Sequence, residues 1–211
     1  SDLHLTAEWV TASHETHGIP LAAPGEVYLW LDRDAHHVRL PRLEGGTAMR
    51  SWQLRQAAPV VAACFDRLTL HARGVALDDV AVAFVAESDA GKSTLAWELV
   101  KAGADPLADD LLPVRFAADI VVPPETPLTH VCFLQRASSA MTLAPLDAAA
   151  AMQRHLANGF GEPGEASAWA FQFDAYHHLT GGVAHFGLTI PDDRSRLDDV
   201  VAWLPDALRA A

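Results

Sequence analysis

The stretch AESDAGKST, residues 86–94, decides the fold predicted for this chain, because its second half matches a phosphate-binding loop. Loops of the form G-x-x-x-x-G-K-[ST], the Walker A pattern, direct backbone N–H groups at phosphates, place a Lys on the outer phosphates and offer a hydroxyl to Mg²⁺. Residues 91–94, GKST, supply the second half intact. Ala86 replaces the first Gly, and Asp89 stands where many such loops have another Gly.

These replacements leave open whether the loop binds a nucleotide. An Asp at position 89 is tolerated even if its φ is positive, and Ala86 costs little if the preceding strand runs straight into the loop. Charge is the larger concern, since two unit charges about 4 Å apart interact by roughly 4 kcal/mol at an effective dielectric constant of about 20. The carboxylates of Glu87 and Asp89 therefore weaken triphosphate binding unless they point to solvent.

The segments on both sides of the loop have the pattern that a phosphate loop requires. Residues 80–86, VAVAFVA, form a continuous apolar run typical of a strand covered on both faces. Apolar residues between Leu95 and Val100 predict a helix, Gly103 ends it, and residues 106–114, PLADDLLPV, resume extended structure. The predicted order is strand, loop, helix, strand, as in a βαβ-like unit.

The rest of the chain predicts further strands and helices around this unit. An N-terminal hairpin is expected from the runs at 27–31 and 36–40, and a helix over 52–68 with a bend at Pro59. Apolar periodicity predicts the remaining elements, namely strands at 68–77, 129–136 and 181–190, helices at 147–157, 165–179 and 196–208, and a mobile loop at 158–166. The fold class is therefore α/β, with a mixed sheet flanked by helices.

Composition limits the function classes. With 211 residues, half of them hydrophobic, the chain is expected to form a single compact unit. A net charge of −12 argues against general binding to nucleic acid or to an anionic membrane. No apolar run reaches the roughly 18 residues of a membrane span. Cys64 and Cys132 form neither a close pair nor a metal-ligand spacing and are expected to be buried, so a cytoplasmic protein is predicted.

Two further sites could carry chemistry. Asp109 and Asp110 follow the loop, where one carboxylate can hold Mg²⁺ and the other can accept a proton from an attacking hydroxyl. Neighbouring side chains on a strand point to opposite faces, so the two are not equivalent. A solvated acidic turn is the plainer interpretation of the pair. His71 is a third candidate, for which the plainer interpretation is a packed strand histidine.

The other histidines give no metal site on spacing grounds. The sequence HETH at 14–17 lies in a breaker-rich segment, and the pairs at 36–37 and 177–178 are adjacent in sequence. Solvated or packed roles are expected for all of them.

Residues 70–114, LHARGVALDDVAVAFVAESDAGKSTLAWELVKAGADPLADDLLPV, resemble the HPr kinase/phosphorylase-like family. They are most similar to its short HPr-kinase-related members, which include kinases acting on lasso-peptide precursors. A weaker resemblance continues through 130–159 and 173–204. The resemblance implies the α/β P-loop fold shared by HPr kinase and phosphoenolpyruvate carboxykinase. Together with the N-terminal strands expected from the sequence, it gives a β-rich segment, 1–50, packed on a P-loop domain, 51–211.

The resemblance also implies roles for individual residues. Three would be catalytic, with Asp109 as the general base toward a serine hydroxyl; they are Asp109, His71 and Lys92. ATP would be held by Ser88, Asp89, Ala90, Gly91, Lys92, Ser93 and Thr94, and Mg²⁺ by Ser93 and Asp110. The sequence departs from the family pattern in three ways. Two loop glycines are replaced, the N-terminal region is short, and the family's second acidic metal ligand has no clear match, with Glu125 as the nearest candidate.

The resulting expectation is an ATP- and Mg²⁺-dependent kinase acting on a serine hydroxyl of a peptide or small protein, such as a ribosomal peptide precursor. A pseudokinase-like protein that binds a peptide or partner without phosphoryl transfer is the alternative, because of Ala86, Glu87 and Asp89. A phosphotransferase acting on a small metabolite is a weaker third. Whether the chain forms a homo-oligomer stays open.

Overall fold

A computed structural model describes residues 67–87, 89–117, 119–123, 126–137, 139–159 and 166–211, together with the backbone of four strands before residue 40. Where the length predicts a single compact unit, the contacts divide the chain into two. One unit comprises residues 1–66 and 160–171, and the other comprises 67–159 and 172–211. The predicted packing of the N-terminal segment on the rest of the chain stays a prediction.

The first unit contains a sheet with the strand order β1-β4-β3-β2, formed by β1 (His4–Thr6), β2 (His17–Leu21), β3 (Val27–Asp32) and β4 (His37–Arg39). Strands β3 and β4 pair antiparallel, with Trp30 opposite Arg39, so the predicted hairpin is confirmed. The helix predicted over 52–68 lies outside the described residues up to position 66. Its last two positions, Arg67 and Leu68, are wrong, because they begin strand β5.

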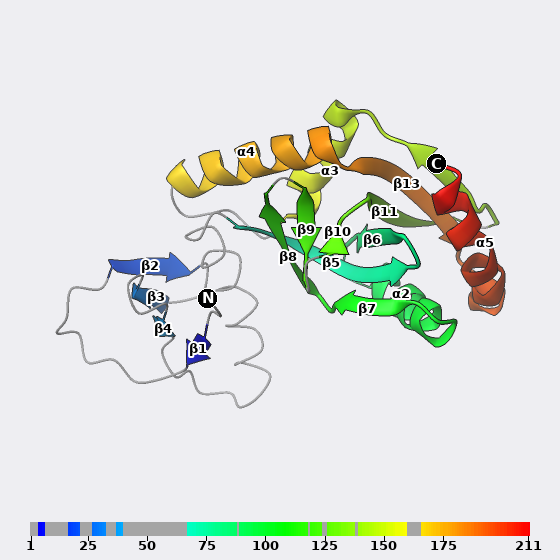
Figure 1. Ribbon diagram of the computed structural model, residues 1–211, viewed down its shortest axis with the longest axis horizontal. Coiled ribbons are helices and arrows are strands. Elements are labelled where there is room, and N and C mark those ends of the chain that lie inside the picture. Colours follow the sequence, from blue (N-terminus) through cyan, green and yellow to red (C-terminus); the bar gives the residue numbers. More distant parts are fainter. Residues whose placement is uncertain are drawn as a thin grey trace. The chain divides into compact units, whose positions relative to one another are not determined.

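The second unit is built on a larger mixed sheet with the strand order β10-β9-β8-β5-β6-β11-β13-β12. Most of these strands are labelled in Figure 1. Strands β6, β11 and β13 are parallel neighbours, and the other pairs are antiparallel. The strands are β5 (Arg67–Leu77), β6 (Val80–Val85), β8 (Leu111–Phe116), β9 (Ile120–Val122), β10 (Thr126–Pro127), β11 (His130–Ala137), β12 (Thr142–Pro145) and β13 (Ala184–Pro191).

The predicted strand, loop and helix around the GKST motif are confirmed. Every residue of β6 is buried, as its continuous apolar sequence predicts. Helix α2 (Lys92–Lys101) follows the loop and ends as expected at Gly103, whose φ is 113°. The N–H of Gly103 donates to Val100 O and that of Ala104 to Leu99 O, a Schellman motif that pairs the last carbonyls of the helix.

The strand after α2 does not pair with β6. Strand β7 (Asp105–Ala108) pairs antiparallel with β5, and β5 itself pairs antiparallel with β6. Strands β6 and β7 therefore run in the same direction with β5 between them, so the βαβ-like unit is split by one strand. Asp109 and Asp110 form the bend from β7 to β8, and both of these strands pair with β5.

The C-terminal half also follows its predicted order. It contains α3 (Ala148–Asn158), α4 (Ala166–Gly182), the short 3₁₀ helix η1 (Arg194–Arg196) and α5 (Leu197–Arg209). Asp147 caps α3 by accepting a hydrogen bond from the Ala150 N–H at 2.8 Å. Strands β9, β10 and β12 and helix η1 are too short to leave a periodic signal. Within the described residues, no helix is long and apolar enough to cross a membrane.

Helices cover both faces of the central strands. Helices α2 and α5 share a hydrophobic core with one face, to which Cys132 and Leu134 of β11 contribute. Cys132 is buried, as predicted, and burial raises the pKa of its thiol, whereas Cys64 lies outside the described residues. Phe133 alternates with these residues and contacts His155 of α3 on the opposite face.

A pair of buried histidines, His155 and His185, lies on that opposite face. Their Nε2 atoms are 3.0 Å apart, and Nδ1 of His185 donates to Val183 O at 2.7 Å. A proton on Nδ1 leaves Nε2 of neutral His185 as an acceptor, so His155 donates between the rings. The Tyr176 ring stacks on His155. Burial lowers the pKa of His155 to about 3 and also lowers that of His185, so both rings are neutral near pH 7.

Candidate functional site

A pocket of about 700 Å³ lies at the carboxyl ends of the parallel strands β6, β11 and β13. This edge of an α/β sheet is where ligands bind, because loops diverge there above the strand ends. The pocket lies within the second unit and is lined by His71, Arg73, Asp89, Gly91, Lys92, Ser93, Thr94, Asp110, Arg136, Asp192 and Arg194.

Charges of both signs meet in the pocket, with cations in excess. Its lining residues include four cations, Arg73, Lys92, Arg136 and Arg194, and three carboxylates, Asp89, Asp110 and Asp192. The whole chain carries a net charge of −12, so this local excess of one positive charge is opposite in sign to the net charge of the protein. Such a reversal suits an anionic ligand in a protein that otherwise repels anions.

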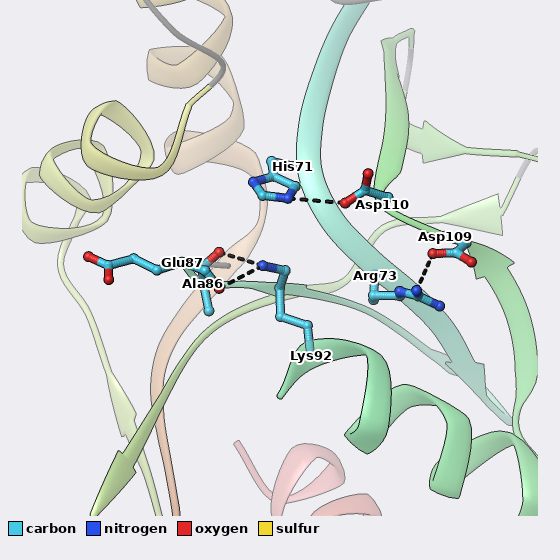
Figure 2. A network of polar contacts seen from close by, with 7 residues as sticks. All are labelled: His71, Arg73, Ala86, Glu87, Lys92, Asp109 and Asp110. Atoms are coloured by element: carbon cyan, nitrogen blue, oxygen red, sulfur yellow. Dashed lines mark hydrogen bonds and ion pairs between the residues drawn. The ribbon is translucent and has the colours of Figure 1, made fainter. Parts of the chain in front are cut away.

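The two loop acids separate in the structure. The side chain of Glu87 is exposed and points away from Lys92 and from the His71–Asp110 pair (Figure 2). Asp89 is also exposed but lines the pocket, with a φ of 63°. The positive φ that the sequence allows for at Asp89 is therefore present, and of the two acids only Asp89 lines the pocket.

The loss of the first glycine has no conformational cost. Ala86 is buried and directly continues β6, and among the described non-glycine residues a positive φ occurs only at Asp78, Asp89 and Asp110. Gly91, at the start of α2, has a φ of 98° and therefore needs to be glycine. The loop thus keeps a glycine at the position whose backbone demands one.

Lys92 points from the first turn of α2 back over the loop (Figure 2). Its Nζ donates to Ala86 O at 2.6 Å and to Glu87 O at 3.0 Å, and only 7% of the residue is exposed. Burial lowers the pKa of the ammonium and Arg73 lowers it further, whereas Asp110 and Asp89 oppose the shift. The loop therefore holds a desolvated cation beside the N-terminus of a helix, where anions bind.

Beside the lysine, strand β5 presents two residues to the Asp pair (Figure 2). Nε2 of His71 lies 3.1 Å from Oδ1 of Asp110, and Arg73 forms an ion pair with Oδ1 of Asp109. Residues 71 and 73 point to the same face of the strand because side chains alternate. Asp110 lines the pocket, whereas the Asp109 side chain is 69% exposed and is not among the lining residues.

Asp110 has a φ of 71°, a left-handed conformation that Asp adopts more readily than most residues. Backbone strain of this kind costs on the order of 1 kcal/mol and clusters at functional sites. The bend between β7 and β8 thus turns one carboxylate into the pocket and leaves its neighbour outside.

Most of the site residues proposed from the sequence gather in this pocket. His71 comes from β5, the Asp110 carboxylate from the β7–β8 bend, and the rest from the loop and the start of α2, namely Asp89, Gly91, Lys92, Ser93 and Thr94. The carbonyl of Ala90 accepts a hydrogen bond from Arg136. Ser88 and Glu125 lie outside the described residues. The role of Asp109 as base stays a prediction. Its side chain pairs with Arg73, which lines the pocket, and does not line the pocket itself.

Four lining residues were missed by the sequence reasoning, and they are Arg73, Arg136, Asp192 and Arg194. Arg73 lies two residues after His71, so strand alternation applied to the histidine would have found it. Arg136 and Asp192 lie at the ends of strands predicted from the sequence, and the rule that α/β ligands bind at such ends applies to both.

The lining residues fit a magnesium ion that is bound together with phosphate. Mg²⁺ prefers oxygen ligands and is usually held by one or two carboxylates plus substrate phosphates. Ser93 supplies a hydroxyl and Asp110 a carboxylate to the same pocket. Within the described part of the chain, no three His, Cys, Asp or Glu side chains are grouped to hold a metal by themselves.

The fold and the pocket together define a mixed α/β protein with a cationic pocket at its parallel strand ends. Among solved structures, the chain is similar to the HPr(Ser) kinase/phosphatase from Coxiella burnetii, with 11% identity and a TM-score of 0.40 over 67% of this chain and 88% of that one. No protein-family model matches the chain. No curated protein matches it either.

Proposed function

We propose that this protein is an ATP- and Mg²⁺-dependent kinase that phosphorylates a serine hydroxyl of a peptide or small protein. The observation that carries the proposal is the convergence of Lys92 and the His71–Asp110 pair in one pocket at the start of helix α2. A helix N-terminus with a buried lysine suits phosphate groups, and a carboxylate beside it suits proton removal from an attacking hydroxyl.

In the proposed reaction, the serine oxygen forms a bond to the γ-phosphorus of ATP. The bond between that phosphorus and the β,γ-bridging oxygen breaks, and ADP leaves with the electron pair. The hydroxyl proton passes to the carboxylate of Asp110, whose orientation His71 fixes through the 3.1 Å contact. We therefore give the role of base to Asp110, because its carboxylate lines the pocket and that of Asp109 does not.

The cations of the pocket would contact different phosphate groups of the nucleotide. Lys92 would contact the outer phosphates once its ammonium exchanges a loop carbonyl for a phosphate oxygen, and Arg73 would face the transferred group. Ser93 and the nucleotide phosphates would hold Mg²⁺, which neutralises charge on the β- and γ-phosphate oxygens when bound. Asp110, expected from the sequence as a metal ligand, is proposed here as the base instead.

Transfer of labelled phosphate from ATP to serine-containing peptides tests the proposal. The Lys92→Met variant should lose nucleotide affinity by about 10-fold to 100-fold, the value of a charge-assisted hydrogen bond of roughly 1.5–3 kcal/mol. Lys101→Met is the matched control, because Lys101 lies at the other end of α2 and pairs with Glu98 outside the pocket. Equal nucleotide affinity in wild type and Lys92→Met contradicts the proposed binding mode.

Asp89 favours a second candidate, a protein of the same fold that binds a peptide or partner without phosphoryl transfer. Its carboxylate lines the pocket in place of a glycine and opposes bound phosphates. Calorimetry with Mg·ATP separates the two candidates. Binding below millimolar nucleotide supports the kinase, and no heat of binding up to millimolar nucleotide supports the non-catalytic protein.

A further inference from the structure

One side chain, that of Arg136, joins two segments that line the pocket. Its Nε donates to Ala90 O at 3.0 Å, and its Nη1 donates to Pro191 O at 3.0 Å. Ala90 belongs to the β6–α2 loop, residues 86–91. Pro191 ends β13 and begins the β13–η1 segment, residues 191–194, which brings two more residues to the pocket. A single planar guanidinium therefore bridges segments about a hundred residues apart in the sequence.

The position of Arg136 in the sheet explains how it reaches both segments. Strand β11 lies between β6 and β13, and Arg136 stands next to its last residue, in register with Ile190. The neighbouring Ala137 O accepts a hydrogen bond from the Asp192 N–H at 2.9 Å, which continues the ladder past the end of β13. A long side chain at the end of the middle strand is thus within reach of the loops that leave both neighbours.

Packing against Gly91 gives Arg136 a third contact with the loop. A Cβ at Gly91 would collide with Nη2 of Arg136. The φ of 98° favours glycine at this position, and any larger residue would displace the guanidinium. Lysine could not replace the arginine here, because an ammonium lacks the planar fork that donates in two directions while lying flat on the backbone.

We propose that Arg136 is a positioning residue that clamps the β6–α2 loop to the β13–η1 segment and so forms the pocket before a ligand binds. Groups held in place in advance lower the entropic cost of binding. The benefit to phosphate binding rests on the proposed function. The clamp itself is a property of the free protein.

Hydrogen exchange of the ligand-free full chain, followed by mass spectrometry, tests the clamp. In Arg136→Lys, amides in residues 86–95 and in residues 192–196 should both exchange about fivefold faster or more, since each segment loses a hydrogen bond. Arg209→Lys is the matched control, because Arg209 donates to Asp206 and Asp78, outside the pocket and outside both measured segments. That control should leave both segments unchanged.

Gly91→Ala provides a second variant that displaces the guanidinium without removing it, and the same joint rise is expected. Exchange in β5 and β6 serves as the reference for overall stability in each variant. Unchanged exchange in both segments, or a rise in only one of them, overturns the clamp. Calorimetry with Mg·ATP on the wild type is independent of this result, so failure to bind ATP contradicts the proposed function and leaves the clamp standing.

Discussion

Nε2 of His71 lies 3.1 Å from Oδ1 of Asp110, whereas the preceding residue, Asp109, forms an ion pair with Arg73. Two carboxylates adjacent in sequence thus have different partners and different access to the pocket. The carboxylate of Asp110 can meet a ligand directly. Asp109 acts on the pocket only through the guanidinium that it orients.

The first prediction separates these two acids. Asp110→Asn should lower the rate of phosphate transfer by about a hundredfold or more, because a general base contributes about 10² to 10⁴ in rate. Asp109→Asn should cost less than about tenfold, since it removes an ion pair between an exposed carboxylate and a partly buried arginine. Transfer rates measured with labelled ATP check both values.

An exposed acid outside the pocket, Asp206, gives the control variant Asp206→Asn, for which no change in rate is expected. A loss in Asp109→Asn as large as that in Asp110→Asn would return the role of base to Asp109.

The second prediction concerns the acidic loop. Asp89→Asn should raise the affinity for ATP by about tenfold or more, because it removes a negative charge from the pocket. Asn also tolerates the left-handed backbone that position 89 adopts. Glu87→Gln makes the same chemical change two residues earlier, where the side chain points away, and should alter affinity by less than about twofold. Calorimetry on the three proteins decides, and equal effects of the two substitutions would mean that Asp89 does not face the phosphates.

The third prediction concerns stability against pH. The pKa of His155 lies at about 3 in the folded protein, below its ordinary value of 6.5. The unfolded chain therefore takes up a proton on this ring as pH falls below about 6.5, whereas the folded chain does not. The free energy of unfolding should fall with acidification from that point, by up to about 1.4 kcal/mol per pH unit for each such ring.

Urea unfolding of wild type and His155→Leu over this pH range measures the effect. The leucine variant should lose part of the pH dependence, because one buried titrating ring has been removed. His177→Gln, at an exposed position on α4, should keep the wild-type dependence. The same dependence in wild type and His155→Leu would show that the buried pair does not govern acid stability.

The fourth prediction compares two glycines that have open space around them. A Cβ added at Gly103 or at Gly181 would meet no neighbouring atom within 4 Å, but only Gly103 has a positive φ, 113°. Gly103→Ala should therefore destabilise the protein by about 1 kcal/mol, through backbone strain at the end of α2. Gly181→Ala lies in the last turn of α4 and should stabilise it by up to about 1 kcal/mol. Thermal unfolding gives both signs, and a destabilised Gly181→Ala would contradict this account.

Much of the fold was predictable because its signals are local. The continuous apolar run of β6, the Asp147 cap of α3 and Gly103 after α2 each mark an element by side chains within a few residues. Strand pairing is not local in this sense. The insertion of β5 between β6 and β7 depends on contacts that no single segment carries.

The site divides in the same way. Lys92 and His71 stand out within their own segments, whereas Arg136 and Asp192 come to the pocket only through the parallel pairing of β11 with its neighbours. Strand alternation also could not predict which of Asp109 and Asp110 lines the pocket. The pair lies in a bend, and the left-handed backbone of Asp110 sets where its carboxylate points.

The three parallel strands give the pocket a modular construction. Lys92 follows the β6–α2 loop, and β11 supplies Arg136, which donates a hydrogen bond to the Ala90 carbonyl of that loop. The segment after β13 supplies Asp192 and Arg194. Arg136 holds that last segment through a hydrogen bond to the backbone carbonyl of Pro191. The side chains of the segment can therefore be replaced without removing this hydrogen bond. Redesign of the pocket can therefore start at positions 192 and 194, with the β6–α2 loop left as it is.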